Sequence, residues 1–310
     1  MTKVQLTDAA DVSNQGLRGT ETAAVPKAKE NMAERDDTAV IYERSNTEAA
    51  VFSSAKAATG ASMSNKQVQS SLSALGFYNG PINGDLSTSL SKKAVKNFQK
   101  VYGLSANGSM NSSTRNRLKE INTMYNKVAT SKELTALASS SKLNLDSGEK
   151  KNLARVWTFL RAGMGFTKNQ CAGICGNLYE ESHFATDNAQ EIKKDGKNKY
   201  AKNHDSDYSF SVNDGIGYGL EQWTHFTVKK PLKETADEMG LAVSDINAQL
   251  GTIRKEVEST RINAWKKVLA KSSYNEVSDT FHDEIERPRI KEYAERRKSS
   301  KKIYDALKNY

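Results

Sequence analysis

Three helix-start signals constrain this chain most, because each opens a segment whose apolar residues recur at helical spacing. In a capping box, a Ser, Thr or Asp side chain accepts a hydrogen bond from a backbone N–H in the first turn of a helix. The side chain of a Glu or Gln three residues later accepts one from the backbone N–H of that capping residue. The pattern occurs at residues 64–67, 146–149 and 167–170. We therefore predict a mainly α protein.

Composition divides the chain into unequal parts. The 310 residues leave room for about two domains, and the net charge of +9 is concentrated in residues 65–121, which hold 8 Lys and Arg against 2 Asp and Glu. A basic block favours a polyanion such as nucleic acid, a membrane surface or a cell-wall polymer. Its lysines follow one helix without interleaved aromatic residues, so we expect no nucleic-acid partner. No apolar run of about 18 residues occurs, so we expect no membrane insertion.

Residues 1–62 show no sustained helical or strand period and are rich in Ala, Thr, Ser, Asp and Glu. Such a segment buries too little apolar surface to form a core. Its first residues also lack the apolar stretch of a secretory signal. We interpret residues 1–62 as a polar N-terminal arm that docks on another protein.

Residues 63–121 predict a small three-helix domain. The first helix ends at Gly76 and the second at Gly103, because glycine is the common residue after a helix end. The third helix starts within residues 111–114. Loops with Asn-Gly pairs, which adopt tight turns readily, separate the helices.

The segments ALGFYNGPINGDL, AVKNFQKVYGL and NGSMNSSTRNRL of this domain resemble the type 1 peptidoglycan-binding family. The resemblance implies a wall muropeptide as ligand, held by the first loop and the second helix. We expect Tyr78 and Asn83 of that loop to bind substrate. Residues 111–114 depart from the family's Gly-x-x-Thr helix start, and the alternative is a helical bundle used only for packing.

Residues 122–146 are rich in Ser, Lys and Asn, with a broken helical pattern, and are predicted to be a linker. Residues 147–310 form the second predicted domain. Its first helix carries Leu153, Val156 and Trp157 on the inner face.

Two adjacent glutamates end a helix of this domain, in the sequence GNLYEESHF at 176–184. Seven residues bring an α-helix back to within about 20° of the starting direction, so Glu181 lies on the side of the apolar Ile174, whereas Glu180 faces water. Burial and the negative end of the helix dipole both raise the pKa of such a carboxyl. Glu181 is therefore a candidate general acid. The alternative is a helix-end carboxylate that bonds a backbone amide or a basic partner.

Glycines alternate with bulky residues in the second motif, NDGIGYGLEQWT at 213–224. The spacing differs from that of phosphate-binding loops. The spacing suits a strand or hairpin whose backbone is closely approached by another chain. Tyr218 or Trp223 could then stack on sugar rings. A buried strand with a core Trp is the alternative.

Together, AGICGNLYEESHF and GIGYGLEQWT resemble the phage tail lysozyme family, and the likeness extends from about residue 152 to residue 304. It implies a lysozyme-like fold, mainly α (α+β) with a small β-hairpin region. It also implies cleavage of the β-1,4 bond between N-acetylmuramic acid and N-acetylglucosamine. The family's catalytic glutamate falls on Glu181. We expect four neighbours to bind substrate, namely Ser182, Tyr218, Gln222 and Trp223.

The partner of Glu181 is expected to be Asp214, as a base that positions water. Without a partner, the substrate's own acetamido group or 6-hydroxyl would attack, and the 6-hydroxyl route defines a lytic transglycosylase. Glu221 stands where the family usually has a small or apolar residue. We interpret Glu221 as a solvent-facing substitution rather than a second carboxylate.

Two rival functions rest on other residues. A cysteine peptidase is suggested by Cys171 in the first turn of a helix, with histidines downstream at 183, 204 and 225. Cys171 shares an apolar face with Cys175, which favours buried packing. No H-E-x-x-H motif occurs, so we expect no metal and no cofactor. A structural tail protein with a degenerate lysozyme domain for wall adhesion is the non-enzymatic alternative.

The sequence therefore predicts a peptidoglycan hydrolase of the muramidase type. We expect it on a phage or phage-like tail particle that acts at the bacterial cell wall, with residues 1–62 bound to a tail or virion protein. The alternative is an endolysin that stays in the host cytoplasm until a holin releases it.

Overall fold

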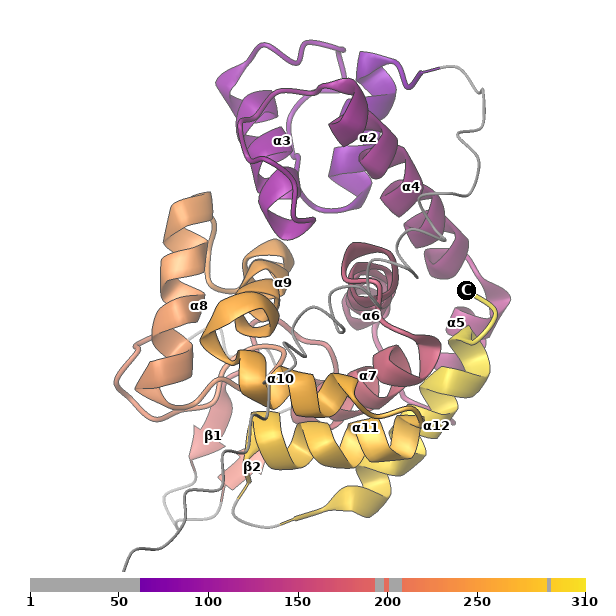
Figure 1. Ribbon diagram of the computed structural model, residues 1–310, viewed down its shortest axis with the longest axis vertical. Helices are drawn as coiled ribbons and strands as arrows, with labels where there is room; N and C mark the ends of the chain where they lie inside the picture. Colours follow the sequence, from indigo (N-terminus) through magenta and orange to yellow (C-terminus); the bar gives the residue numbers. More distant parts are fainter. Residues whose placement is uncertain (1–61, 193–197, 201–207, 289–290) are drawn as a thin grey trace, which may run out of the picture. The chain divides into compact units, whose positions relative to one another are not determined.

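The computed structural model describes residues 62–192, 198–200, 208–288 and 291–310 (Figure 1). The predicted N-terminal arm lies outside these residues, apart from its last residue. The predicted mainly α class is confirmed, since nearly all regular structure in the described residues is helical. Within the described part of the chain, no helix is long and apolar enough to cross a membrane.

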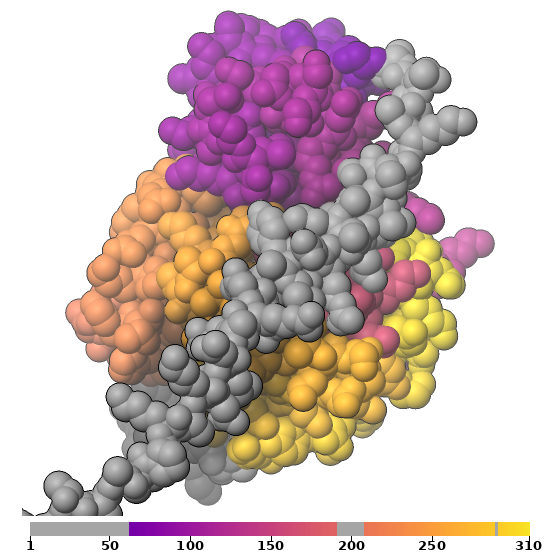
Figure 2. Space-filling model, in the orientation of Figure 1, coloured from indigo at the N-terminus to yellow at the C-terminus, as the bar shows by residue number. Residues whose placement is uncertain are grey.

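The first three described helices are α2 (Asn65–Ala74), α3 (Ser89–Val101) and α4 (Ser112–Ala129). The capping box predicted at 64–67 is confirmed, with both reciprocal hydrogen bonds present. Gly76 and Gly103 follow the ends of α2 and α3 with φ of 83° and 67°. In the space-filling view, these helices form one continuous body, coloured indigo to magenta (Figure 2). Its core is apolar and includes Val68, Leu72, Val95, Phe98, Leu118 and Ile121.

Two buried glutamines hold the two loops of this body in the same way. The Oε1 atom of Gln69 accepts the backbone N–H of Gly84 at 2.6 Å, and its Nε2 donates to Asn83 Oδ1 at 3.2 Å. The Oε1 atom of Gln99 accepts the backbone N–H of Gly108 at 2.8 Å. Each glutamine thus satisfies the polar groups of an Asn-Gly turn from inside the body.

The segment 122–146, predicted to be a linker, is folded instead. Helix α4 continues to Ala129, and α5 (Lys132–Leu137) follows directly. The prediction was wrong because most of the Ser, Lys and Asn residues of this segment are exposed on the outer faces of these helices. A buried apolar stripe lies beneath them, formed by Tyr125, Val128, Leu134, Leu137 and Leu143.

The remaining chain builds a helical domain around α7. Its elements are α6 (Ser147–Thr158), η1 (Phe159–Gly163), α7 (Lys168–Ser182), β1 (Gln190–Ile192), β2 (Asn198–Tyr200), α8 (Phe226–Met239), α9 (Ile246–Lys255), η2 (Glu256–Thr260), α10 (Ile262–Leu269), α11 (Tyr274–Phe281), η3 (His282–Glu286) and α12 (Tyr293–Leu307). The capping boxes predicted at 146–149 and 167–170 are confirmed. Strands β1 and β2 pair antiparallel, with Gln190 opposite Tyr200. Elements labelled η are π-helical turns.

Helix α7 lies against α6, α11 and α12 (Figure 1). Two glycines on α7 permit this approach. A Cβ atom on Gly176 would lie 2.6 Å from the backbone N of Ser300 in α12, and one on Gly173 would lie 2.7 Å from the carbonyl O of Tyr274, at the start of α11. The backbone of α7 is therefore in direct contact with both neighbours.

Helix α3 is joined to the second domain by hydrogen bonds between polar side chains and helix-end carbonyls. Asn97 Nδ2 donates to the carbonyl O of Met239 at 3.0 Å, and Arg254 Nε donates to that of Val101 at 2.8 Å. Both sets of residues belong to one compact unit. Lys93 Nζ of α3 also donates to the carbonyl O of Gly240 at 2.7 Å, so the basic face of α3 is partly used for internal contacts.

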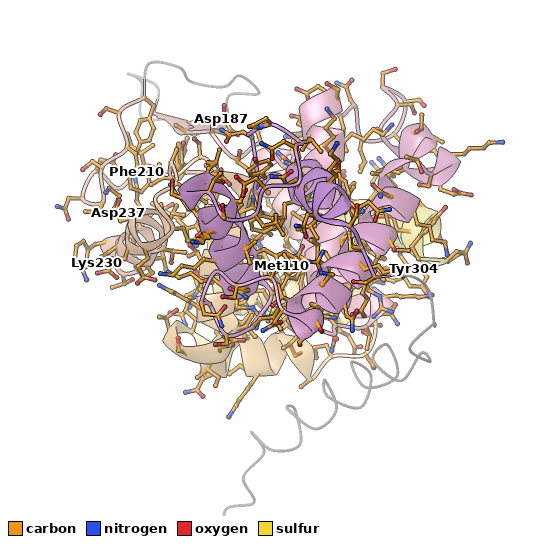
Figure 3. All side chains as sticks on the ribbon, turned by 90° about the horizontal axis from the view of Figure 1, so that it is seen from above. Met110, Asp187, Phe210, Lys230, Asp237 and Tyr304 are labelled. Carbon is orange, nitrogen blue, oxygen red and sulfur yellow. The ribbon has the colours of Figure 1, made fainter. Side chains whose placement is uncertain are left out.

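The outer face of α8 carries ion pairs at i,i+4 spacing. Lys230 Nζ lies 2.5 Å from Glu234 Oε1, and Lys233 Nζ lies 2.6 Å from Asp237 Oδ2. Figure 3 shows Lys230 and Asp237 directed away from the core. Exposed pairs of this kind add at most about 1 kcal/mol, so α8 is held mainly by its buried face.

The contact of α7 with α12 predicts a large cost for one methyl group. We expect Gly176→Ala to lower the free energy of unfolding by about 2–3 kcal/mol, because the added Cβ meets the Ser300 backbone and α12 must shift. Denaturant unfolding followed by circular dichroism measures this change. Gly148→Ala in α6 is the matched control, since its Cβ would meet only Asp146 Oδ1, at 3.2 Å. Equal losses in both variants would contradict the prediction.

Candidate active site

Glu181 occupies the last turn of α7 and points into the domain, as predicted. Its exposed fraction is 8%. Glu180, which we predicted to face water, is only half-exposed, and its Oε1 accepts a hydrogen bond from Ser299 Oγ at 2.6 Å. The seven-residue argument thus identified the buried carboxyl correctly.

Two residues from the C-terminal part of the chain contact Glu181. Arg296 of α12 donates from Nη2 to Glu181 Oε1 and from Nε to Glu286 Oε2, the latter at 3.0 Å. Glu286 is the last residue of η3 and is itself buried. One guanidinium therefore bridges two buried carboxyl groups through charge-assisted hydrogen bonds.

Glu286 is in turn contacted by His282, the first residue of η3. Its Nε2 accepts the backbone N–H of Glu292 at 3.2 Å, so the proton of the neutral ring lies on Nδ1. Nδ1 donates to Glu286 Oε2. Burial, and then the nearby charge of Arg296, lower the pKa of His282 to about 4, so the ring is neutral near pH 7.

The pair Glu181–Glu286 holds one proton, and we assign it to Glu181. Burial, followed by the charge of Glu286, raises the pKa of Glu181 to about 8, although Arg296 opposes the shift. Burial also raises the pKa of Glu286, but Arg296 and a hydrogen bond with Glu181 stabilise its charged form. Like charges this close do not both ionise.

Glu221 and Glu256 form a second buried carboxyl pair beside an arginine, Arg261. Glu256, the first residue of η2, accepts from Trp223 Nε1 at 2.9 Å and lies 3.3 Å from Arg261 Nη1. Burial, followed by the charge of Glu256, raises the pKa of Glu221 well above its usual range. The side chain of Glu221 is 2% exposed, so our interpretation of it as solvent-facing was wrong. Nothing in the sequence indicated this burial, because the surrounding chain is a series of turns without helical periodicity.

Charge balance favours one proton on each pair. With all four glutamates ionised and His282 neutral, the two arginines would leave a net charge of −2 in a buried region. One proton on each pair brings the sum to zero. Because a buried unpaired charge costs several kcal/mol, the protonated state is strongly favoured.

Irregular backbone surrounds these carboxyl groups. Glu256 and Glu286 lie in π-helical turns, which are frequent at functional sites. Three non-glycine residues with positive φ follow a buried glutamate by one or two positions, namely His183 (55°), Gln222 (49°) and Arg287 (53°). Each costs about 1–2 kcal/mol relative to ordinary backbone. The surrounding packing has to offset that cost.

Ser182 and Gln222 tie the end of α7 to the glycine-rich loop. Ser182 Oγ donates to the carbonyl O of Leu220 at 3.1 Å. Gln222 Nε2 donates to the carbonyl O of Asn188 at 3.2 Å. Both side chains are buried. Their substrate-binding roles stay predictions, and their contacts support a positioning role.

The glycine-rich segment is a series of turns rather than a regular strand, although Tyr218 and Trp223 exchange backbone hydrogen bonds in a hairpin-like turn. Trp223 is buried, with its ring N–H on Glu256, which matches the alternative of a core Trp. Tyr218 is also buried and packs between Tyr208 and Phe210. Neither ring presents a free face to a sugar in this structure.

Asp214 is held by Lys229. Lys229 Nζ, itself buried, lies 2.5 Å from Asp214 Oδ1, and Tyr208 Oη donates to Asp214 Oδ2 at 2.5 Å. Hydrogen bonds from Lys229 and Tyr208 lower the pKa of Asp214 against the opposing effect of burial. Within the described residues, Asp214 shares no hydrogen bond or ion pair with Glu181, and its role as a base stays a prediction.

The two residues predicted in the wall-binding loop support its shape. Tyr78 is buried and its hydroxyl donates to the carbonyl O of Pro81 at 3.0 Å. Asn83 is exposed, and its Oδ1 accepts from Gln69 and from the backbone of Asp85. Their ligand contacts stay predictions.

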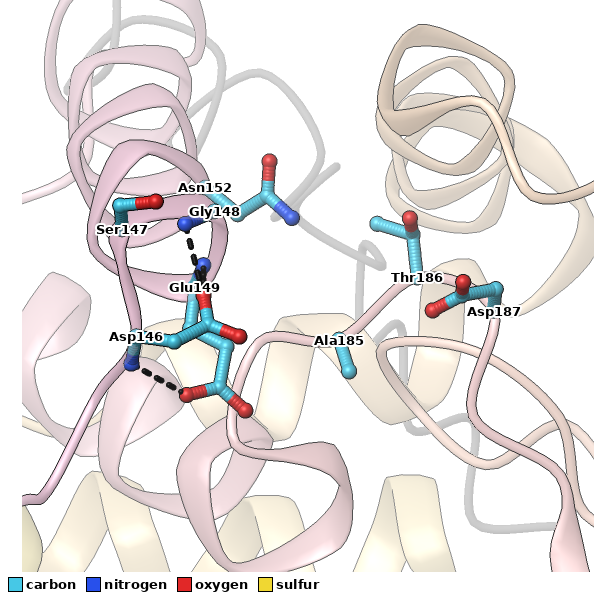
Figure 4. A pocket seen from close by; sticks show the side chains of 8 residues that line it. All are labelled: Asp146, Ser147, Gly148, Glu149, Asn152, Ala185, Thr186 and Asp187. Carbon is cyan, nitrogen blue, oxygen red and sulfur yellow. Dashed lines mark hydrogen bonds between the residues drawn. The ribbon is translucent and has the colours of Figure 1, made fainter. Parts of the chain in front are cut away.

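A polar cavity of about 330 Å³ lies between the start of α6 and the loop that follows α7 (Figure 4). Its wall includes the capping box of α6, whose hydrogen bonds are drawn in the figure. Asn152 closes one side and donates to the carbonyl O of Phe184 at 2.9 Å. The remaining wall is Ala185, Thr186 and Asp187.

The residues of the rival functions are placed differently. Cys171 and Cys175 are both buried, and burial raises the pKa of Cys175 well above its usual range. A buried thiol with a raised pKa is a poor nucleophile. Among the side chains that the structure describes, no group of three or more His, Cys, Asp or Glu residues has the arrangement of a metal site.

Sequence reasoning missed Glu286, Arg296, His282, Glu256 and Arg261. A signal existed for Arg296, because it begins the buried helical stripe that continues with Ser300, Ile303 and Leu307. An arginine on a buried stripe needs a buried acid. The partner is not readable from the sequence, because it lies on a different element.

Each of the two helical parts of the chain matches a known family. Residues 65–118 match the family described as a peptidoglycan binding domain. Residues 151–307, just over half of the 310, match the family described as phage tail lysozyme. The chain therefore belongs to the phage tail lysozyme family. Searches of curated proteins and of solved structures gave no match.

The raised pKa of Glu181 predicts a pH-dependent stability. Because the folded pKa of about 8 exceeds the usual 4.5, the folded state binds this proton more tightly than the unfolded chain. The resulting stability is complete below the unfolded pKa and is lost as pH rises through the folded pKa, at up to about 1.4 kcal/mol per pH unit. Urea unfolding of wild type and Glu181→Gln across this range measures the difference. Parallel pH curves for the two proteins would contradict the assignment.

Proposed function

We propose that this chain is a muramidase-type peptidoglycan hydrolase in which Glu181 is the general acid. The observation that carries the proposal is the carboxyl buried at the end of α7, in a chain of the phage tail lysozyme family. A carboxyl with a pKa of about 8 is protonated at neutral pH and can donate to a leaving group.

In this mechanism, the Glu181 O–H bond breaks and its proton passes to the glycosidic oxygen while the bond from that oxygen to the sugar carbon breaks. The carbon develops positive charge, as in other glycosidases. Glu181 becomes a carboxylate and is then paired by Arg296, which already contacts it. Water completes hydrolysis, and we propose Asp214 as the base that positions it.

The wall-binding module supplies the polymer to this site. Ile82 and Leu90 are both 41% exposed, which is unusual for large apolar side chains in the described residues. Leu90 lies beside the loop at Gly80, where an added Cβ would come within 2.7 Å of it. We propose that this exposed apolar edge and the loop around Tyr78 and Asn83 bind the muropeptide.

Delivery from outside the cell is the second part of the proposal. The tail lysozyme family supports a phage or phage-like tail particle as carrier, with residues 1–62 docked on a tail or virion protein. Release as an endolysin would need the same catalytic domain. Purified particles probed with an antibody to this chain distinguish the two routes.

The glycosidase assignment predicts that Glu181→Gln loses activity by about a hundredfold or more on purified peptidoglycan, because the proton donor is removed. Turbidity loss and product mass measure this. Cys171→Ala is the control and is expected to keep wild-type activity. Loss only in the alanine variant, with new free amino groups, would make the enzyme a peptidase. No turbidity loss with the wild type, together with equal wall adhesion in wild type and the glutamine variant, would indicate a structural wall-binding protein.

The products separate the two glycosidase outcomes. Hydrolysis leaves reducing sugar ends, whereas attack by the 6-hydroxyl leaves 1,6-anhydro ends. Mass spectrometry of the soluble fragments distinguishes them, because the two products differ by one water.

Asp214 has a test of its own. If Asp214 acts as the base, Asp214→Asn lowers kcat by about a hundredfold while the melting temperature stays close to that of the wild type. Lys229→Met, which removes the cation that holds Asp214, is the comparison variant. A fall in melting temperature with unchanged kcat would limit Asp214 to holding the loop.

A further inference from the structure

We propose that Glu286 is a positioning residue of the catalytic acid, and that its carboxylate, fixed by Arg296 and His282, holds the reactive proton on Glu181. The inference rests on the proposed function, because it assigns a partner to the proposed acid. It also gives the second buried carboxyl of the pair a different task from that predicted for Asp214.

The surroundings of Glu286 stabilise it as the charged member of the pair. Its Oε2 atom accepts from Arg296 Nε and from His282 Nδ1. The tautomer that makes His282 a donor at Nδ1 is fixed by the backbone N–H of Glu292 on the other side of the ring. Two donors, one of them cationic, therefore converge on one oxygen of Glu286.

The other oxygen, Glu286 Oε1, is buried and has no donor in the described residues as long as both carboxyl groups are unprotonated. A buried acceptor without a donor costs about 1–3 kcal/mol. Glu181 is in hydrogen-bonding contact with Glu286, so a proton on Glu181 supplies a donor to this carboxyl group. The unsatisfied acceptor thus favours a proton on Glu181, and the negative charge of Glu286 retains it there.

Several other charged groups surround Glu181 and Glu286. Arg296 acts on both carboxyl groups, while the charge of Glu180 and the buried carboxyl of Glu221 lie near Glu286. Helix α11 contributes Asp279, which is paired with Arg297 instead. The other charged or titratable groups facing the pair are Asp283 of η3, Glu292 before α12, and Glu256 and Arg261 of the second pair.

Glu286 and Arg296 shift the pKa of Glu181 in opposite directions. The charge of Glu286 raises the pKa of Glu181, whereas that of Arg296 lowers it. Removing the carboxylate therefore makes Glu181 lose its proton at lower pH, and removing the guanidinium makes it lose the proton at higher pH. A purely structural role would not produce shifts in opposite directions.

The test is the pH dependence of kcat on purified peptidoglycan. We expect Glu286→Gln to move the alkaline fall in kcat to lower pH by about one unit or more, with a smaller change in KM. We expect Arg296→Gln to move it to higher pH. Glu286→Asp, which keeps the charge, is expected to return the fall to near the wild-type pH.

The matched control is Glu284→Gln, in the same π-helical turn. Its side chain is partly exposed and pairs with Lys267 at 2.8 Å. It is expected to leave the pH profile unchanged. Infrared difference spectra of each folded variant, against the same variant with Glu181→Gln, report the protonated Glu181 carboxyl without any assay of activity.

The outcomes separate this inference from the proposed function. Wild-type activity in Glu181→Gln would overturn the proposed function. An inactive Glu181→Gln together with an unshifted alkaline limb in Glu286→Gln would overturn only the role of Glu286. If Glu286→Gln does not fold, the direction of the shift in Arg296→Gln decides, and a shift to lower pH or no shift overturns the inference.

Discussion

The close contact between α7 and α12 is the constraint on which the site depends. Gly176 lets the backbone of α12 approach at Ser300, and Arg296 lies one helical turn earlier on the same buried stripe. Its guanidinium consequently reaches Glu181 at the end of α7. A side chain at position 176 would separate the helices and weaken the buried pairing of Glu181 with Arg296, which is costly.

The balance of buried charges determines how many of the glutamates near this contact are protonated. Two arginines cannot balance four buried glutamates, so the domain retains protons that water would remove near pH 7. The acid function thus arises from an imbalance in the buried charges rather than from Glu181 alone. The second pair, Glu221 with Glu256, uses the same device and also binds the indole N–H of Trp223. It links the glycine-rich loop to the core next to the acid.

The sequence predicted the local features well because their causes are local. Capping boxes and glycine helix ends depend on residues three or four positions apart, and all three capping boxes are present. The inward direction of Glu181 followed from helical geometry within one element. The prediction failed for residues 122–146, where polar composition concealed a buried stripe, and for Glu221, whose burial depends on contacts with η2 and Arg261.

The sequence by itself determined the mainly α class, the two family resemblances and the identity of the buried glutamate. Only the tertiary structure decided which groups surround it. Glu286 and Arg296 lie more than a hundred residues from Glu181 along the chain, and they meet it because π-helical turns and the packing of glycine-bearing α7 bring three elements together. The pKa of an acid depends on such through-space contacts, since desolvation and Coulomb energy follow distance in space rather than position in sequence.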